Sequence, residues 1–284
     1  MIADKDTDFI YLSDLLRTKN DFAVNCSCIC DILNKHSIKY DFLKGTQDIW
    51  ARDYMPIQVS EKKFVEFRYD PDYLQGIEKD QRNLKTYPDI VCQKHNIKTI
   101  KSGLIVDGGN VVKSHNTAIM TDKVFTENRY NFTKDEVQKK LIEILELEKL
   151  VIVPWFDKDE EDFCGHTDGY VRFIDDKTVL VNHIYQNKSS LINPLKKAGL
   201  KVEKLNFNVK KENENNWAYL NFLQTKDIIL IPKLDAEEDE QALSQLSEYF
   251  SDYASNNRII FIPNMLPIIK EGGALNCISW TVKT

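Results

Sequence analysis

The sequence of 284 residues has no apolar run near the ~20 residues that a membrane-spanning helix requires. Its first residues, MIADKDTDFIYLSDLL, carry acidic side chains where a secretory signal peptide carries a basic segment. We therefore expect a cytoplasmic protein that makes no contact with membranes.

Basic residues are not in excess, because 38 Lys and Arg stand against 44 Asp and Glu, for a net charge of −6. Charges of both signs are interspersed, whereas nucleic-acid binding is typical of a clustered basic face. We expect no nucleic-acid partner. A mildly acidic protein is compatible with a small cationic ligand.

The six cysteines do not have the arrangement of a disulfide framework in a chain of this length. Three of them, Cys26, Cys28 and Cys30, lie in DFAVNCSCICDILNKHSI, which predicts a helix, and no second ligand pair has zinc-finger spacing. We expect these cysteines to pack as small hydrophobic residues, and we expect no metal site.

No Pro/Gly/Ser-rich linker divides the chain, which indicates one domain over residues 1–284. Within it, a strand-like segment recurs at intervals of about 50–60 residues, the length of one supersecondary repeat. These segments are 36–44, 95–103, 147–155, 198–206 and 256–264. Helix-like stretches precede them at 20–36, 79–95, 133–147, 188–198 and 238–255. We predict an α/β fold of five repeats around an axis, an arrangement like a propeller.

A polar loop and two apolar strands follow each strand-like segment. The loops are DIWARDYMP, VDGGNVV, FCGHTDGYVRF, ENNWAYLNF and EGGALNCIS. Because they occupy the same phase of the repeat, we expect all five to meet at one mouth.

Two loops carry groups suited to covalent catalysis. His166 and Asp168 are two residues apart and would share one side of a strand, where the carboxylate keeps the histidine protonated as an acid. Cys277 follows the pair Gly272–Gly273, which allows a ligand to approach the backbone closely. A thiol becomes a nucleophile when nearby positive charge stabilises its thiolate.

Acidic and aromatic side chains in the loops favour a cationic substrate. Asp53, Asp107 and Asp168 supply carboxylates, and carboxylate pairs bind a planar guanidinium through bidentate hydrogen bonds. Trp50 or Trp217 could stack on that cation. The residues predict a cysteine-dependent enzyme acting on a small guanidinium compound.

The ordered set of motifs resembles the agmatine deiminase and bacterial peptidylarginine deiminase family. The matching motifs are Trp50-x-Arg52-Asp53, Asp107-Gly108-Gly109-Asn110, Gly165-His166-Thr167-Asp168 and Gly272-Gly273-x-x-x-Cys277. They run in the right order over nearly the whole chain. The family belongs to the guanidino-group-modifying superfamily, so the resemblance implies the five-bladed pentein fold.

The resemblance also implies roles for single residues. Cys277 matches the nucleophile, His166 the general acid/base, and Asp53 and Asp168 the carboxylates that hold the guanidinium. Asp107 stands where the superfamily more often has a glutamate that supports the histidine.

We expect Trp50, Trp217, Asn110 and Gly273 to contribute to substrate binding. The implied reaction needs no cofactor and would convert agmatine, in polyamine metabolism, to N-carbamoylputrescine.

Departures from the family leave the substrate open. Met55 stands before Pro56 where agmatine enzymes usually have glycine, and Ala274-Leu275-Asn276 replaces their usual Gly-Asn-x-His before the cysteine. Alternatives are an amidinotransferase on the same fold, a catalytically silent binder of cationic ligands, and a cysteine amidase or protease that uses Cys277, His166 and Asp168. The sequence does not determine oligomeric state, and a homo-oligomer is compatible with it.

Overall fold

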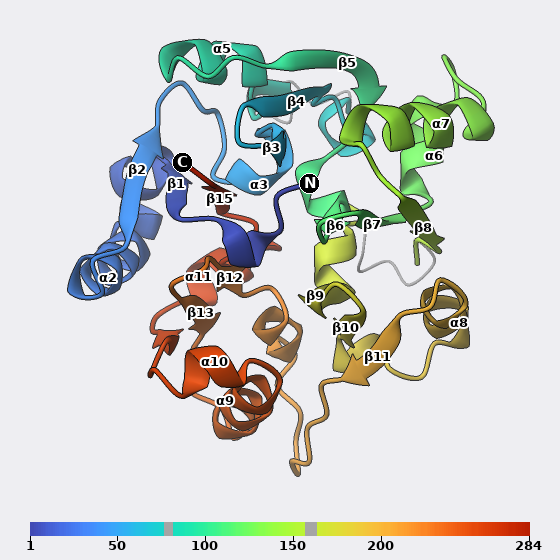
Figure 1. Cartoon of the computed structure of the whole chain (residues 1–284). Coiled ribbons are helices and arrows are strands. Elements are labelled where there is room, and N and C mark those ends of the chain that lie inside the picture. Colours follow the sequence, from blue (N-terminus) through green and yellow to red (C-terminus); the bar gives the residue numbers. More distant parts are fainter. Residues whose placement is uncertain (77–81, 157–163) are drawn as a thin grey trace.

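The computed structural model describes residues 1–76, 82–156 and 164–284. The described strands form five three-stranded sheets arranged in a ring (Figure 1). Their orders are β15-β1-β2, β3-β4-β5, β6-β7-β8, β9-β10-β11 and β12-β13-β14. The strands are β1 (Phe9–Ser13), β2 (Lys39–Leu43), β3 (Ile57–Ser60), β4 (Lys63–Arg68), β5 (Ile100–Ile105), β6 (Val112–Lys113), β7 (Thr117–Thr121), β8 (Lys149–Val153), β9 (Val171–Asp175), β10 (Thr178–Val181), β11 (Lys201–Lys204), β12 (Leu223–Gln224), β13 (Ile229–Pro232), β14 (Ile259–Ile262) and β15 (Ser279–Val282).

All five sheets share one pairing pattern, which confirms the predicted five-repeat α/β propeller. The middle strand pairs antiparallel with one neighbour and parallel with the other. A parallel pair needs a crossover, and helices supply it on the outside of the ring (Figure 1). These helices are α1 (Leu15–Thr18), α2 (Asn20–Lys35), α5 (Pro88–Lys94), α6 (Lys123–Asn128), α7 (Lys134–Leu145), α8 (Ser189–Lys197), α9 (Glu238–Tyr249) and α10 (Ser251–Ala254).

Helix α7 illustrates how the sequence specifies these crossovers. Thr133 and Glu136 form a reciprocal capping box at its start, and Val137, Leu141 and Leu145 bury one face at a spacing of four residues. The stretch 79–95 differs from its prediction, because the chain leaves helical geometry over 85–87 and α5 begins at Pro88. A proline suits the first turn of a helix, where its missing N–H is not needed.

None of the helices in the described ranges is long and apolar enough to cross a membrane.

The two ends of the chain close the ring. Strand β15 pairs antiparallel with β1, with Val282 opposite Phe9 and Ser279 opposite Leu12. Figure 1 places the N-terminus near the middle of the ring and the C-terminus beside β1. The closure fixes the position of Cys277, which lies two residues before β15.

The repeat as read from the sequence straddles two sheets. For example, the segment 36–44 becomes β2, which pairs with β1, whereas the apolar strands after the loop become β3 and β4 of the next sheet. Each polar loop therefore connects neighbouring sheets. This offset has a simple cause, because periodicity defines the length of a repeat but not which strands pair.

Candidate active site

The five inter-sheet loops turn through one turn of helix or a tight turn, and each contributes a polar side chain. The helical turns are α3 (Ala51–Tyr54), η3 (Gly108–Asn110), η5 (Thr167–Gly169), η7 (Asn216–Tyr219) and, in the last loop, α11 (Leu266–Ile269). The side chains are those of Asp53, Asp107, His166, Asn221 and Cys277. All five predicted catalytic residues thus lie in four of these loops, because Asp168 shares the loop of His166.

His166 lies between two buried carboxylates. Its Nε2 is 3.0 Å from Oδ2 of Asp107, and its Nδ1 is 3.5 Å from Oδ1 of Asp53. The hydroxyl of Tyr73 donates to the same Oδ2 of Asp107 at 3.0 Å. Asp107 therefore holds both the ring and the tyrosine, and it reaches His166 without the extra methylene of a glutamate.

The glycines of two loops are needed for close approach. A Cβ on Gly109 would lie 2.5 Å from Oδ1 of Asp53 and 2.7 Å from Nδ1 of His166, while its N–H donates to that carboxylate at 3.0 Å. A Cβ on Gly273 would lie 2.2 Å from the ring of Trp50. Any side chain at either position would displace a predicted site residue.

The carboxylates around His166 keep it cationic. Burial by itself lowers the pKa of the imidazole, but Asp53 and Asp107 outweigh burial and raise the pKa to about 10. Burial raises the pKa of Asp53 to about 7, against the opposing effect of the His166 charge. His166 is therefore a proton donor at neutral pH.

Cys277 lies in a second group, with two asparagines and Asp168. Oδ1 of Asn221 accepts from the Cys277 thiol and from its N–H, both at 3.3 Å. Oδ2 of Asp168 accepts from the side-chain amides of Asn276, at 2.6 Å, and Asn221, at 3.2 Å, and lies 3.7 Å from the Cys277 sulfur. These contacts tie together the loops of the third, fourth and fifth repeats.

The surroundings of Cys277 keep it a thiol when no cation is bound. Burial raises the pKa of the Cys277 thiol well above its usual range, and the charges of Asp168 and Asp53 add to this effect. The backbone of Ala274 acts in the opposite direction. The charge of Asp53 thus acts on His166 and on Cys277 alike, which connects the two groups electrostatically.

The predicted strand that carries His166 and Asp168 is wrong. Both residues belong to the 3-10 turn η5, with His166 as its N-cap, and β9 begins only at Val171. The two side chains join different groups, so Asp53 and Asp107 are the carboxylates in contact with His166. Trp217, in the predicted loop ENNWAYLNF, lies in the short 3-10 turn η7.

The predicted substrate-binding residues have differing surroundings. Trp50 and Trp217 are half-buried and pack against the largest hydrophobic core. Oδ1 of Asn110 accepts from the backbone and hydroxyl of Thr121, at 2.8 and 3.0 Å, and from the hydroxyl of Thr167, at 2.7 Å. Asn110 thereby fixes η5, the turn that carries His166.

The sequence assigns no role to Asn221, Asn276 or Tyr73, although the first two lie in the predicted loops ENNWAYLNF and EGGALNCIS. Tyr73 lies in FRYDPDYL, between the first and second of these loops. Asparagine and tyrosine are common in loops, so residue type alone does not single out these positions. Only their closeness to the motifs could have indicated them.

The cysteine-rich helix has the expected structural role. Cys26 and Cys30 lie on one face of α2 with their sulfurs 4.0 Å apart, and Cys26 is buried in the core. In the part of the chain that the structure describes, no cluster of three or more His, Cys, Asp or Glu has the geometry of a metal site.

The five-sheet ring, with a cysteine, a histidine and carboxylates in its inter-sheet loops, defines the class of guanidino-group-modifying proteins with the pentein fold. A family profile described as Porphyromonas-type peptidyl-arginine deiminase matches residues 23–282. The chain therefore belongs to this family.

Individual relatives agree with this assignment. A Lactococcus lactis protein, provisionally named an agmatine deiminase, is 24% identical over 228 residues, which cover 66% of this chain and 60% of that protein. The matched region therefore spans less than two thirds of that relative.

Solved structures share the fold over almost the entire chain. The agmatine deiminase of C. jejuni has a TM-score of 0.75 at 17% identity, covering 100% of this chain and 95% of that one. The agmatine deiminase of Enterococcus faecalis has a TM-score of 0.69 at 16% identity, covering 98% and 93%. DDAH of Pseudomonas aeruginosa has a TM-score of 0.60 at 13% identity, covering 97% and 99%.

Proposed function

We propose that the protein is a deiminase that hydrolyses a small guanidinium compound, with Cys277 as nucleophile and His166 as general acid and base. The observation that carries this proposal is the placement of a buried thiol and a cationic histidine under the influence of the same carboxylates, Asp53 and Asp168. A planar cation held by these carboxylates would present its central carbon to the sulfur.

The proposed reaction has two halves. As the cation binds, the Cys277 thiol loses its proton to solvent and the thiolate adds to the guanidinium carbon. His166 donates a proton to one NH₂ group, which leaves as ammonia and takes up a proton from solvent as ammonium. The carbon is then a thiouronium bonded to sulfur. His166, now neutral, takes a proton from water as the water adds to this carbon, and breakage of the C–S bond releases the ureido product and the thiol. The sum is guanidinium plus water giving a urea and ammonium.

Agmatine is the substrate best supported, because the arginines that could bind an α-carboxylate are engaged elsewhere. Arg52 and Arg172 are buried against Asp4. Arg68 pairs with Asp70, and Arg129 donates to the carbonyl of Thr126 at 2.5 Å. Agmatine has no carboxylate, and two of the structural relatives are named agmatine deiminases. The product would be N-carbamoylputrescine.

From its sequence, the acidic run Asp159–Asp162 is compatible with an anchor for the amine end of agmatine or with a solvated loop. It lies outside the described residues.

The experiment is to incubate purified protein separately with agmatine, free arginine and an arginyl peptide, and to quantify ammonia and ureido product. We expect both products in equal amounts and the highest kcat/KM with agmatine. Ammonia without ureido product, or full turnover by Cys277→Ala, would overturn the proposal. Cys28→Ala, on the outer helix α2, is the matched cysteine control and should retain wild-type turnover.

A further inference from the structure

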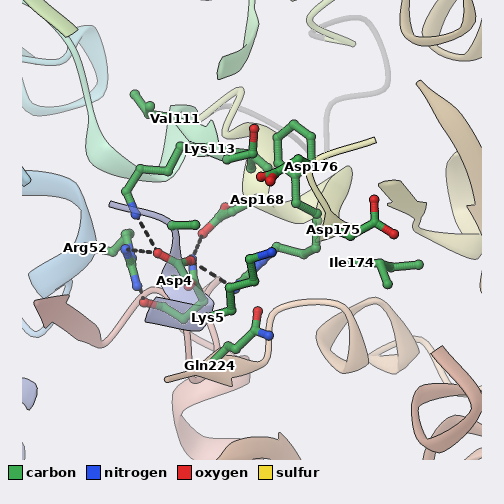
Figure 2. A pocket seen from close by; sticks show the side chains of 16 residues that line it. Asp4, Lys5, Arg52, Val111, Lys113, Asp168, Ile174, Asp175, Asp176 and Gln224 are labelled. Carbon is green, nitrogen blue, oxygen red and sulfur yellow. Dashed lines mark hydrogen bonds and ion pairs between the residues drawn. The ribbon is translucent and has the colours of Figure 1, made fainter. Parts of the chain in front are cut away.

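Three cations converge on the carboxylate of Asp4 at the centre of the ring (Figure 2). Asp4 belongs to the short turn η1 (Asp4–Asp6), which comes before the first strand. Its Oδ1 lies 2.6 Å from Nζ of Lys113 and 3.7 Å from Nη1 of Arg52, and its Oδ2 lies 3.2 Å from Nη2 of Arg172. The three cations come from three different repeats.

The charges of this cluster depend on one another. The side chains of Arg52, Lys113 and Arg172 are less than a tenth exposed. Burying a cation is costly unless an anion compensates it, and Asp4 is the carboxylate that all three share. Burial opposes the charge of Asp4, but the three cations outweigh burial and hold its pKa well below the usual range.

Two of these cations also hold the loops that carry Cys277 and Asn221. Nε of Arg52 donates to the carbonyl of Asn276 at 3.4 Å, next to Cys277. Nη1 of Arg172 donates to the carbonyl of Phe222 at 2.9 Å, next to Asn221, and its guanidinium lies 4.5 Å from the centroid of the Phe222 ring. Arg172 therefore connects Asp4 to the loop of the fourth repeat, and Arg52 connects it to the loop of the fifth repeat.

A cavity of about 20 Å³ lies beside the cluster. It is lined by Asp4, by all three cations and by Asp168, which belongs to the residues around Cys277. Nη2 of Arg52 and Oγ of Ser114 are both buried here without a hydrogen-bond partner. This volume suits one or two water-sized groups. Removing the Asp4 carboxylate would enlarge the cavity by roughly the volume of a small carboxylate ion.

We propose that Asp4 is a positioning residue that fills an anion site formed by Arg52, Lys113 and Arg172, and that it thereby holds the Cys277 and Asn221 loops in their catalytic arrangement. Asp4 contacts Arg52, Lys113 and Arg172, so its effect on the catalytic side chains would pass through these cations. The effect on turnover rests on the proposed function, whereas the effect on the thiol does not.

The test replaces the carboxylate and then supplies a small anion in solution. In Asp4→Ala we expect kcat to fall about tenfold and KM to change by less than about twofold. The loops lose order in this variant, but the protein carboxylates that bind the substrate remain. Alkylation of Cys277 by iodoacetamide, followed by peptide mass spectrometry, should become at least about threefold faster as the buried sulfur is uncovered. Sodium formate should reverse both effects in a saturable manner.

Asp8→Ala is the matched control, because Asp8 pairs with Lys226 and Thr284 outside the cluster. It should change neither readout, with or without formate. Wild-type kcat and alkylation in Asp4→Ala would overturn the proposal, and so would losses that formate does not reverse.

If Asp4→Ala does not fold, Asp4→Asn decides the question. It keeps the shape and removes the charge, so wild-type values of both readouts would refute the role of the anion. If the wild-type protein turns over no guanidinium, the proposed function fails, but the alkylation series still tests Asp4.

Discussion

Replacing Asn221 gives the most direct test of which hydrogen bonds hold Cys277 in place. Replacing it with alanine removes the acceptor for the Cys277 N–H and thiol, together with a donor to Asp168. The N–H of Asn276 is less affected, because it also donates to the backbone carbonyl of Asn221 at 3.0 Å. The loss is therefore one buried N–H left without its acceptor and one hydrogen bond to a carboxylate.

These two losses set the size of the expected effect. A buried N–H without a partner costs about 1–3 kcal/mol and a hydrogen bond to a charged group contributes about 1.5–3 kcal/mol, so we expect Asn221→Ala to destabilise the protein by about 3 kcal/mol. For a chain of this size that corresponds to a decrease in Tm of about 6 °C. Misplacement of the sulfur should lower kcat by about tenfold to a hundredfold.

Differential scanning calorimetry and steady-state kinetics measure the two effects on the same preparation. Asn208→Ala is a suitable control, because Asn208 is exposed and bonds Gln241 through its main chain. It should shift Tm by less than about 1 °C, as surface substitutions usually do. If Asn221→Ala kept both the wild-type Tm and the wild-type kcat, the hydrogen bonds described around Cys277 would not hold the thiol in place.

Two further changes test the neighbouring contacts. Gly273→Ala places a methyl group 2.2 Å from the Trp50 ring, so we expect about 1–3 kcal/mol of destabilisation and a higher KM, whereas Gly103→Ala, with open space around it, should change neither. Asp107→Asn removes a charge that raises the pKa of His166, so the acid form is lost at lower pH. The alkaline limb of kcat/KM, expected near pH 10 in the wild type, should move down by about one pH unit or more, and an unmoved limb would show that another group controls it.

The sequence predicted the number of repeats and the loops that form the candidate site, because both depend on spacing and residue type. Cys277, His166 and Asp53 lie on equivalent loops as expected. Side-chain direction inside a loop was less predictable, since His166 and Asp168 sit on a 3-10 turn and point to different partners. The partners of Asp4 could not be predicted at all, because they are contacts between residues at least 48 positions apart that no local pattern encodes.

The charges on either side of Asp168 suggest an order for the first catalytic steps. On the substrate side, burial and the charges of Asp168 and Asp53 disfavour a thiolate at Cys277. On the other side, the charge of Arg172 is largely compensated by Asp4 and held at the Phe222 carbonyl. A guanidinium cation bound by the carboxylates would cancel the charges that keep the thiol protonated, so its arrival should favour loss of the thiol proton. The nucleophile would then form mainly in the presence of a cation, which limits reaction with neutral electrophiles and makes the positive charge of the substrate part of its own activation.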